Sequence, residues 1–333
     1  MKKIRIAQIG FNQNSHSVPI FASLAKQSDI FEIAGYVLPE NERERIPDKV
    51  NAFADYKELS LDDVLNDPSI EAVTVETEEI YLTKYAFMAA KAGKHIHMEK
   101  PGGISLADFE ALIRIMKQTG KVFHTGYMYR YNPYIRELIE QVKAGELGEI
   151  ISVEAQMNCI HPKELRQWLA LHPGGMMFYL GCHLVDLVLL LQGQPSKIIP
   201  YNTCSGIDGV TGKDFGMAVM EYPNGVSFVK TTAVELGGFA RRQLVVNGTK
   251  ATVELNPLEW YVPGTENLQT QKIVRKAQSW HDAGEKDISV PCDRYDTMMR
   301  SFAEYVSGEK TNPYSLDYEL ELYKTVLKCC GEA

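Results

Sequence analysis

The sequence predicts a two-domain α/β protein, in which a doubly wound parallel sheet is followed by an α+β domain with a large, mostly antiparallel open sheet. In the first third of the chain, short apolar runs alternate with helical patterns, and such alternation implies parallel strands joined by crossover helices. Later strands follow one another with few helices between them, which is typical of an antiparallel sheet. The 333 residues suffice for two hydrophobic cores. We therefore expect domains at residues 1–125 and 126–333.

The first domain is predicted to contain five short, apolar strands separated by helices. Helical spacing of apolar residues recurs around residues 20–24, 85–90 and 107–118, and Gly93 and Gly120 close the last two of these helices. Runs of this length with few polar interruptions indicate strands that are buried on both faces. The expected strands are Ile4–Ile9, Phe31–Leu38, Ala72–Thr77, His95–Met98 and Val122–Tyr127.

The second domain follows a linking helix over Tyr134–Ala144 and has longer strands with alternating apolar residues. A helix over Gly175–Leu191 should cover one face of the sheet, and helices over Tyr295–Val306 and Leu316–Cys329 should close the chain. Because nothing obvious covers the other face, we expect a homodimer or homotetramer formed through this sheet. The expected strands are Ile150–Met157, Phe215–Tyr222, Val226–Val234, Arg242–Val246 and, after the turn Asn247-Gly248, Ala251–Leu255.

Charge and composition exclude several classes of partner. The formal net charge is −8 and no block of Lys and Arg occurs, which argues against nucleic acid or an anionic membrane surface as the partner and favours a small molecule. The start of the chain lacks the pattern of a signal peptide, and no apolar segment is long enough to span a bilayer, so a cytoplasmic protein is expected. The 6 cysteines form no CxxC pair and should be reduced thiols.

The first turn between a strand and a helix is a weak dinucleotide motif. Residues 10–15 read GFNQNS, where a dinucleotide-binding turn has GxGxxG, and only Gly10 is kept. Asn12 tolerates left-handed backbone and Ser15 is small, so a turn that includes Phe11 could still cradle a diphosphate at the helix N-terminus. The alternative is a turn that binds no ligand.

The end of the second strand lacks the acid that usually holds the adenosine ribose. Leu38 stands there, and its side chain cannot accept a hydrogen bond from a ribose hydroxyl. Arg43 and Arg45 follow closely and could contact a 2'-phosphate, although the favoured interpretation is a solvated, charged helix start.

A lysine is predicted at the ligand-binding edge of the parallel sheet. Residues 93–101 read GKHIHMEKP, so that the fourth strand ends at Lys100, and Pro101 rigidifies the turn that carries it. A lysine at the carboxyl end of a parallel strand lies where such sheets bind ligands, and its charge can orient a substrate hydroxyl. The alternative is an exposed loop lysine.

A helix in the second domain carries a candidate general base. Tyr179, His183 and Asp186 are separated by four and three residues, which places them along one side of an otherwise apolar helix. His183 is the candidate base, because an imidazole titrates near neutral pH.

Two further groups of residues suit ordinary structural roles. Trp168, on a predicted loop, could line a substrate pocket or pack in the core. His95, His97, His161, His172 and Cys159 lack the spacing of metal ligands, and no metal site is expected.

These motifs together resemble the Gfo/Idh/MocA family, the relatives of glucose-fructose oxidoreductase and inositol dehydrogenase. The likeness runs nearly end to end and is most specific in two segments, Glu99-Lys100-Pro101 and Gly181-x-His183-x-x-Asp186. Further matching segments are AGKH at 92–95, GYMYRYNP at 126–133, Trp168 with Gly174-Gly175, and NGTKA at 247–251.

The resemblance implies an NAD(P)-dependent oxidoreductase, with NAD or NADP as cofactor, that transfers a hydride to or from a hydroxyl carbon of a sugar, cyclitol or similar polyol. A Rossmann-like domain would precede the open-sheet domain. Lys100 would orient the hydroxyl, and His183 would take or give its proton. By position, the cofactor would contact Gly10, Phe11, Asn12, Ser15, Leu38, Thr77, Glu99 and Lys100, and the substrate Arg130, Trp168, Tyr179 and His183, with Tyr179 also catalytic.

Three departures from the family pattern support an alternative function. Tyr179 replaces an Asp, and a mostly neutral phenol cannot act as a charged partner for His183. Thr77 is followed by Glu78 and Glu79, whose charges would disfavour a nearby diphosphate unless they point to solvent. The glycines of the first turn and the ribose acid are also missing. The alternative is a non-catalytic ligand-binding or regulatory protein, and an elimination or hydrolysis with tightly held NAD is a third possibility.

Overall fold

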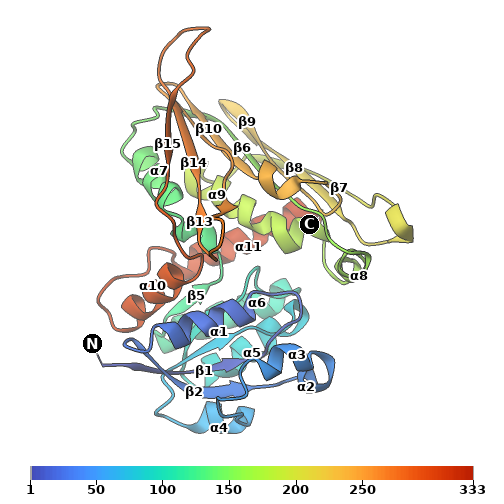
Figure 1. Ribbon diagram of the computed structural model, residues 1–333, viewed down its shortest axis with the longest axis vertical. Coiled ribbons are helices and arrows are strands. Elements are labelled where there is room, and N and C mark those ends of the chain that lie inside the picture. Colours follow the sequence, from blue (N-terminus) through green and yellow to red (C-terminus); the bar gives the residue numbers. More distant parts are fainter. Residues whose placement is uncertain (1, 333) are drawn as a thin grey trace. The chain divides into compact units, whose positions relative to one another are not determined.

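The computed structural model describes residues 2–332, which form two compact units (Figure 1). The N-terminal unit contains the chain up to Tyr127 together with Tyr295–Tyr323. The C-terminal unit contains Met128–Arg294 and the residues from Lys324 onward. Sequence patterns assign all residues after 125 to the second domain, whereas the segment Tyr295–Tyr323 packs with the first unit. The apolar pattern of an amphipathic helix predicts that one face is buried, but it does not identify the domain against which that face packs.

The N-terminal unit is built on a five-stranded parallel sheet with the order β2-β1-β3-β4-β5, which confirms the predicted doubly wound sheet. The two central strands that lead to the candidate cofactor edge, β1 and β3, are almost wholly buried, as their apolar runs predict. The strands are β1 Ile4–Ile9, β2 Phe31–Val37, β3 Ala72–Val75, β4 His95–Met98 and β5 Phe123–Thr125.

Helices cover this sheet, and α1 packs beside α10 while α5 packs beside α6. Local sequence sets their ends: the Ser105 side chain accepts the Asp108 N–H at the start of α6, and Gly120 closes that helix with a φ of 63°. The helices are α1 Ser17–Lys26, α2 Glu42–Arg45, α3 Pro47–Asn51, α4 Leu61–Asn66, α5 Glu79–Lys91, α6 Leu106–Thr119 and α10 Asp296–Val306, and α11 Leu316–Cys330 runs from this unit into the other.

The C-terminal unit is built on an eight-stranded sheet with the order β15-β14-β11-β10-β6-β9-β8-β7. All its pairs are antiparallel except β6 with β9, which confirms the mostly antiparallel sheet. The strands are β6 Ile150–Asn158, β7 Lys197–Thr203, β8 Phe215–Tyr222, β9 Gly225–Thr232, β10 Gln243–Gly248, β11 Thr252–Leu255, β14 Gln271–Arg275 and β15 Glu285–Ile288, and β12 Trp260–Tyr261 and β13 Leu268–Gln269 form a separate ribbon.

Helix α9, Cys182–Gln192, packs on β6 and β9, as expected for the helix that covers one face of this sheet. It directly continues a π-helical turn, Met177–Gly181. Two further helices of this unit are α7, Pro133–Lys143, and α8, Lys163–Trp168. Trp168 is therefore the last residue of a short helix, where the sequence suggests a loop.

The structure contains strands that the sequence does not predict. β7 alternates weakly because most of its residues are only half buried at the sheet edge, and β15 is exposed along its whole length. Asn247 and Gly248 lie within β10 rather than in the turn that follows it.

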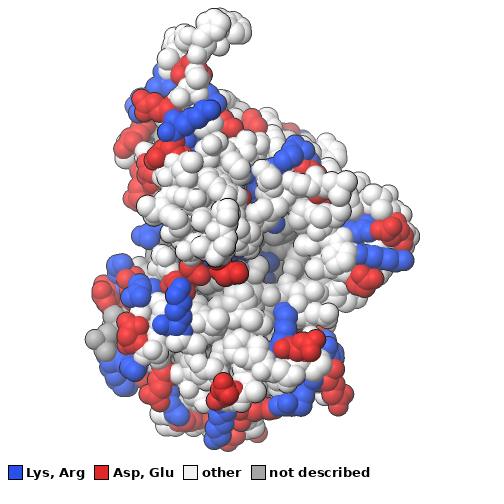
Figure 2. Space-filling view, in the orientation of Figure 1, with Lys and Arg blue, Asp and Glu red and all other residues white. Residues whose placement is uncertain are grey.

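The surface agrees with the charge pattern of the sequence. On the face drawn in Figure 2, Lys and Arg are interspersed with Asp and Glu. Within residues 2–332, no helix combines the length and the apolar character needed to cross a membrane.

Candidate cofactor and substrate sites

The turn between β1 and α1 is held against the end of β3. Gly10 has a φ of +90°, and a Cβ there would lie 2.7 Å from Thr77 Cγ2, so only glycine fits. The Asn12 N–H donates to the Glu76 carbonyl oxygen over 2.9 Å, and Asn12 Nδ2 donates to Glu79 Oε2 over 3.1 Å. Asn12 is not among the residues with positive φ, so its side chain serves the turn by hydrogen bonding rather than by left-handed backbone.

Two residues assigned to the cofactor by position belong instead to an apolar cluster. The Phe11 ring stacks on Phe53 with 5.0 Å between centroids and also contacts Phe21 and Tyr36. Leu38 packs against the same cluster. Their side chains therefore fill the space beside β2, and only the backbone of Phe11 faces polar groups.

The backbone N–H of Phe11 donates to a buried carboxylate. Two consecutive left-handed residues, Glu40 and Asn41, turn the chain after β2 so that α2 starts with Glu42. Glu42 is 1% exposed, and its Oε2 accepts the Phe11 N–H over 2.8 Å. Burial raises the pKa of Glu42 to about 7, although this hydrogen bond and Arg45 favour the ionised form.

The basic residues after β2 are already paired with carboxylates. Arg43 pairs with Glu58, and Arg45 Nη1 lies 2.9 Å from Glu78 Oε2. Both arginines are exposed on α2, in agreement with a solvated helix start. Lys49 Nζ, from α3, donates to the Asn12 carbonyl oxygen over 2.5 Å, so an ammonium group lies against the β1–α1 turn.

A cluster of buried acids and one lysine lies at the carboxyl ends of β3 and β4. Glu76, Glu79, Glu99 and Lys100 are each at most 4% exposed. Lys100 Nζ lies 3.6 Å from Glu99 Oε1, so Lys100 is a buried, paired residue and not an exposed loop lysine. The condition that Glu78 and Glu79 point to solvent is not met, because Glu79 is buried against Asn12.

Burial governs the charge of these acids. It raises the pKa of Glu79 to about 7, against the opposing effect of Lys100. It also raises the pKa of Glu99, where Lys100 again favours the ionised form. Since an acid with a pKa of about 7 is partly neutral near pH 7, Glu79 contributes less negative charge to the cluster than its composition suggests.

These residues fit a nicotinamide dinucleotide. The β1–α1 turn leads into a helix of 10 residues, whose positive end suits a diphosphate. Among residues 2–332, no hydrogen bond uses the Gln13 N–H in this turn. Ser15 lies in the same turn, where its Oγ accepts the Ser17 N–H over 3.2 Å. The turn therefore retains a donor for an anion despite its missing glycines.

The buried state of Glu42 predicts a pH-dependent stability change. We expect Glu42→Gln to raise the free energy of unfolding by about 1–3 kcal/mol at pH 8 and to change it little near pH 4. A folded-state pKa of about 7, above the usual 4.5 of a glutamate, makes the carboxyl's contribution fully present below pH 4.5 and lost as the pH rises through 7. Glutamine removes that loss and still accepts the Phe11 N–H. Urea unfolding at both pH values measures the change.

The control for this prediction is Glu44→Gln, which alters an exposed acid on the same helix. It should leave the stability unchanged at both pH values. An equal effect of Glu42→Gln at pH 4 and pH 8 would contradict the assignment.

In the C-terminal unit, Arg130 and Asp186 form a buried two-point ion pair. Arg130 Nε and Nη2 each donate to one Asp186 oxygen over 2.8 Å, and both residues are 1% exposed. Arg130 lies on the 3₁₀ turn Met128–Tyr131 and Asp186 on α9. The sequence assigns Arg130 to the substrate by position, but in the structure its guanidinium is bound to Asp186. This ion pair can hold α9 in place.

His183 lies one turn before Asp186 on α9 and is buried. Its ring meets the Tyr129 ring edge to face, with centroids 5.2 Å apart. The start of this helical segment depends on Gly174-Gly175, both with left-handed φ, where a Cβ on Gly175 would lie 2.3 Å from the Lys213 carbonyl oxygen. The π-helical turn that follows holds Tyr179 before α9 begins, and such turns occur frequently at functional sites.

Aromatic rings gather around Tyr179. Trp168 meets Tyr179 edge to face with centroids 5.5 Å apart, and His161 does so at 6.1 Å. Trp168 also contacts His172 at 4.1 Å. Trp168 and Tyr179 are half buried, so their surfaces remain partly available to a ligand. The structure thus brings two of the predicted substrate residues together.

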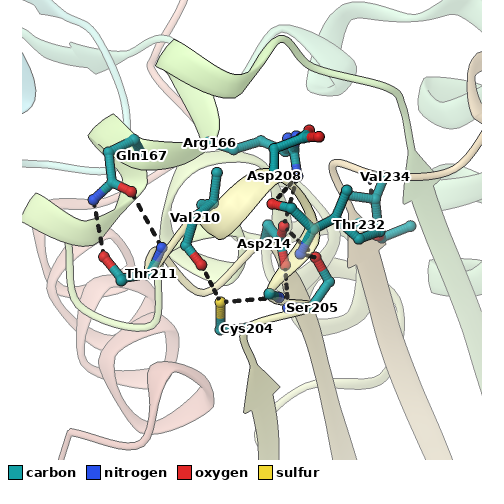
Figure 3. Close-up of polar contacts among 12 residues, drawn as sticks. Arg166, Gln167, Cys204, Ser205, Asp208, Val210, Thr211, Asp214, Thr232 and Val234 are labelled. Carbon is teal, nitrogen blue, oxygen red and sulfur yellow. Dashed lines mark hydrogen bonds and ion pairs between the residues drawn. The ribbon is translucent and has the colours of Figure 1, made fainter.

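The helix that carries Trp168 is tied to the loop between β7 and β8 (Figure 3). Arg166 Nη1 lies 3.3 Å from the buried Asp214 carboxylate, and Arg166 also pairs with Asp208. Gln167 and Thr211 exchange two hydrogen bonds, of 2.9 and 3.2 Å. These contacts fix α8 and with it the position of Trp168.

Several polar groups near the candidate sites have no clear sequence signal. Glu259 accepts from Tyr129 Oη and Arg242 over 2.5 Å each and from Arg294 over 2.6 Å, although these residues are far apart in the chain. Glu42 and Lys49 likewise follow β2 on short helices that look solvated. Glu76 alone could have been noticed, as a charged residue in an apolar strand.

Two family models match the chain. Residues 4–127 match the oxidoreductase family with an NAD-binding Rossmann fold, and residues 135–254 match the GFO/IDH/MocA C-terminal domain.

Individual relatives agree with these models. The 1,5-anhydro-D-fructose reductase of Ensifer adhaerens is 23% identical over 254 residues, which are 75% of this chain and 73% of the reductase. The aldose-aldose oxidoreductase of Caulobacter crescentus, solved with glycerol, has the same fold with a TM-score of 0.77 at 19% identity, covering 99% of this chain and 98% of that one. A levoglucosan dehydrogenase solved with NADH and levoglucosan gives a TM-score of 0.78 at 16% identity, with the same coverage.

Proposed function

Because the chain belongs to the Gfo/Idh/MocA family of oxidoreductases, with an NAD-binding Rossmann domain, we propose that it transfers a hydride between nicotinamide and a hydroxyl carbon of a sugar, cyclitol or similar polyol. The observation that carries the proposal is the buried Lys100, which lies at the carboxyl end of β4 and is paired with Glu99. The carboxyl end of a parallel strand is where such sheets bind ligands, and an ion pair buried there carries a desolvation cost that a role in ligand binding would explain.

The N-terminal unit would hold the cofactor, NAD or NADP, which supplies the hydride chemistry when bound. The β1–α1 turn, from Gly10 to Ser15, would receive the diphosphate at the start of α1. Lys100 would donate a hydrogen bond from Nζ to the reacting hydroxyl, and Glu99 holds that ammonium in place. Thr77 packs under Gly10 and supports the turn.

The C-terminal unit would contribute the proton-transfer group. His183 would take the hydroxyl proton during oxidation and return it during reduction. The Arg130–Asp186 pair fixes α9 one turn beyond His183 and so orients the imidazole. Tyr179 would donate or accept a hydrogen bond as a neutral phenol, where family members have a carboxylate.

The aromatic side chains support a carbohydrate or cyclitol substrate. Trp168 and Tyr179 offer half-buried ring surfaces of the kind on which the C–H face of a sugar ring can stack. The names of the relatives point the same way: one reduces 1,5-anhydro-D-fructose, and another was solved with levoglucosan. The substrate of this chain is proposed from that class.

A second function is favoured by one observation. The Phe11 N–H is taken by Glu42 and the Asn12 N–H by Glu76, so part of the β1–α1 turn is satisfied without any ligand. A non-catalytic, ligand-binding or regulatory protein would need only a stable turn of this kind, without a bound cofactor.

The experiment that separates the two functions has two steps. Purified protein, first checked for bound nucleotide, is titrated with NADH and NADPH by calorimetry and then screened with NAD and NADP against sugars and cyclitols. Micromolar cofactor binding followed by turnover supports the oxidoreductase. Absence of binding by the folded protein favours the second function, and turnover that survives Lys100→Ala and His183→Ala together shows that the proposed residues are wrong.

The proposal extends to a homodimer or homotetramer through the eight-stranded sheet. Helix α9 covers one face, and Tyr201, Val226 and Ile288, on three different strands, remain about half exposed. We expect light scattering of the purified protein to give a mass of two or four chains. A monomer at micromolar concentration would contradict this part of the proposal, for which Tyr201→Lys is the variant expected to weaken association.

A further inference from the structure

Glu76 is the most unusual polar residue of the N-terminal unit. It directly follows β3 and is 0% exposed, and neither carboxyl oxygen has a hydrogen-bond partner among residues 2–332. An ionised carboxylate in such a place loses its hydration without compensation and is strongly unfavourable. The buried position of the Glu76 carboxyl therefore favours its protonated, neutral form.

The groups around Glu76 come from every element packed against it. Like charges are Glu79, on α5, and Glu99, after β4. Opposite charges are Lys100 and, from α3, Lys49. Both lysines have other partners, since Lys100 pairs with Glu99 and Lys49 donates to the Asn12 carbonyl oxygen. Burial and the two acids raise the pKa of Glu76 well above its usual range, against the effect of the lysines.

A buried histidine pair extends from Glu76 into the sheet. His97 Nε2 lies 3.6 Å from Glu76 Oε1, and His97 Nδ1 lies 2.7 Å from His124 Nδ1 on the neighbouring strand. One ring must donate across this short contact, and when His97 donates, its Nε2 becomes an acceptor that faces Glu76. Burial lowers the pKa of His97 to about 3, so the imidazole stays neutral. A neutral carboxyl beside a neutral imidazole needs no counter-charge.

Glu76 is directly linked to the candidate diphosphate turn. Its carbonyl oxygen accepts the Asn12 N–H over 2.9 Å, and its own N–H donates to Ile9 in β1. A diphosphate at this turn brings negative charge next to the buried cluster, and repulsion at short range in a low dielectric is strong. Protonation of Glu76 removes its part of that repulsion.

We propose that the N-terminal unit binds a nicotinamide dinucleotide only when Glu76 is protonated, so that a single buried proton sets the cofactor affinity. The inference rests on the proposed cofactor binding and deepens it. Glu76 acts through the charge that its side chain places beside the Asn12 turn, and it is a positioning residue. The acidic segment after β3 would repel a diphosphate when ionised, and it is compatible with one below the pKa of Glu76.

The test is the pH dependence of NADH and NADPH affinity, measured by calorimetry between about pH 6 and about pH 10. For the wild type we expect a constant Kd at low pH and a tenfold rise per pH unit above the pKa of Glu76, because binding then takes up one proton. Glu76→Gln mimics the neutral acid and should bind with little change across that range. It should exceed the wild-type affinity about a hundredfold two pH units above the transition.

Matched variants identify the titrating group. Glu79→Gln removes the other buried acid that contacts the turn, and the alkaline transition should persist in it. Glu71→Gln changes a half-exposed acid of the same unit and should match the wild type throughout. Difference infrared spectra of the wild type should show the carbonyl band of a neutral carboxyl near pH 7 that Glu76→Gln lacks, and Glu76→Ala replaces the glutamine variant if that does not fold.

The outcomes separate this inference from the proposed function. Failure of NADH and NADPH to bind at any pH overturns the proposed function. Binding with the same pH profile in wild type and Glu76→Gln, or the absence of a neutral-carboxyl band that depends on Glu76, overturns the inference alone.

Discussion

Replacing His183 by asparagine is expected to lower turnover about 10²- to 10⁴-fold, the range typical for loss of a general acid or base. His183 is the buried imidazole of α9, oriented by the Tyr129 ring and followed by the fixed Asp186. Asparagine keeps a polar side chain of smaller size but takes no proton near neutral pH. Steady-state kinetics with the polyol identified by the screen measure the loss.

The effect should fall on kcat, and the affinity for NADH measured by calorimetry should stay unchanged, since the proposed cofactor site lies in the N-terminal unit. His281→Asn serves as the control, because His281 is an exposed histidine of the same unit as His183. A loss of less than about fivefold in a folded His183→Asn protein would show that another group moves the proton.

The parallel sheet of the N-terminal unit could be predicted from the sequence because its strands are buried on both faces. Strands such as β1 and β3 then read as short apolar runs, and helices with clear stops, such as Gly120 after α6, separate them. β7 and β15 lie at the two ends of the eight-stranded sheet, where exposure removes the apolar alternation that a sequence pattern needs.

Some residues of the candidate site could likewise be predicted from the sequence, and others could not. Lys100 and His183 stand in local motifs, and a motif can be recognised from neighbouring residues alone. The Glu42 contact with Phe11 and the Arg130 contact with Asp186 join residues 31 and 56 positions apart, and only the folded chain brings them together. Likewise, Glu79 looks solvent-exposed in the sequence because charged residues usually are, and only the packing of α5 against Asn12 buries it.

These contacts change the interpretation of the degenerate cofactor turn. The missing glycines and the acid pair after Thr77 suggest a lost site when each is taken alone. In the structure, the same residues form one hydrogen-bonded assembly in which Asn12 joins the turn to Glu76 and Glu79. An assembly of buried acids next to a turn whose Gln13 N–H has no partner among residues 2–332 favours a modified cofactor site over a lost one, because buried acids with raised pKa values cluster at functional sites.

Replacing Arg130 by methionine is expected to lower the free energy of unfolding by about 3–5 kcal/mol. The change leaves the Asp186 carboxylate buried without the guanidinium that donates to both its oxygens over 2.8 Å. Loss of one partner from a buried pair is costly for this reason, whereas loss of both partners is much less so. Urea unfolding, compared at pH 7, measures the change.

The double variant Arg130→Met with Asp186→Leu therefore decides between two roles for the pair. If the pair mainly compensates buried charge, the double variant should recover most of the stability lost by Arg130→Met. Activity gives the second readout: we expect kcat to remain reduced even where stability returns, because leucine no longer fixes the helix turn beyond His183. Recovery of both stability and kcat in the double variant would mean that the ion pair does not position His183, and that this histidine is oriented by its aromatic neighbour Tyr129 instead.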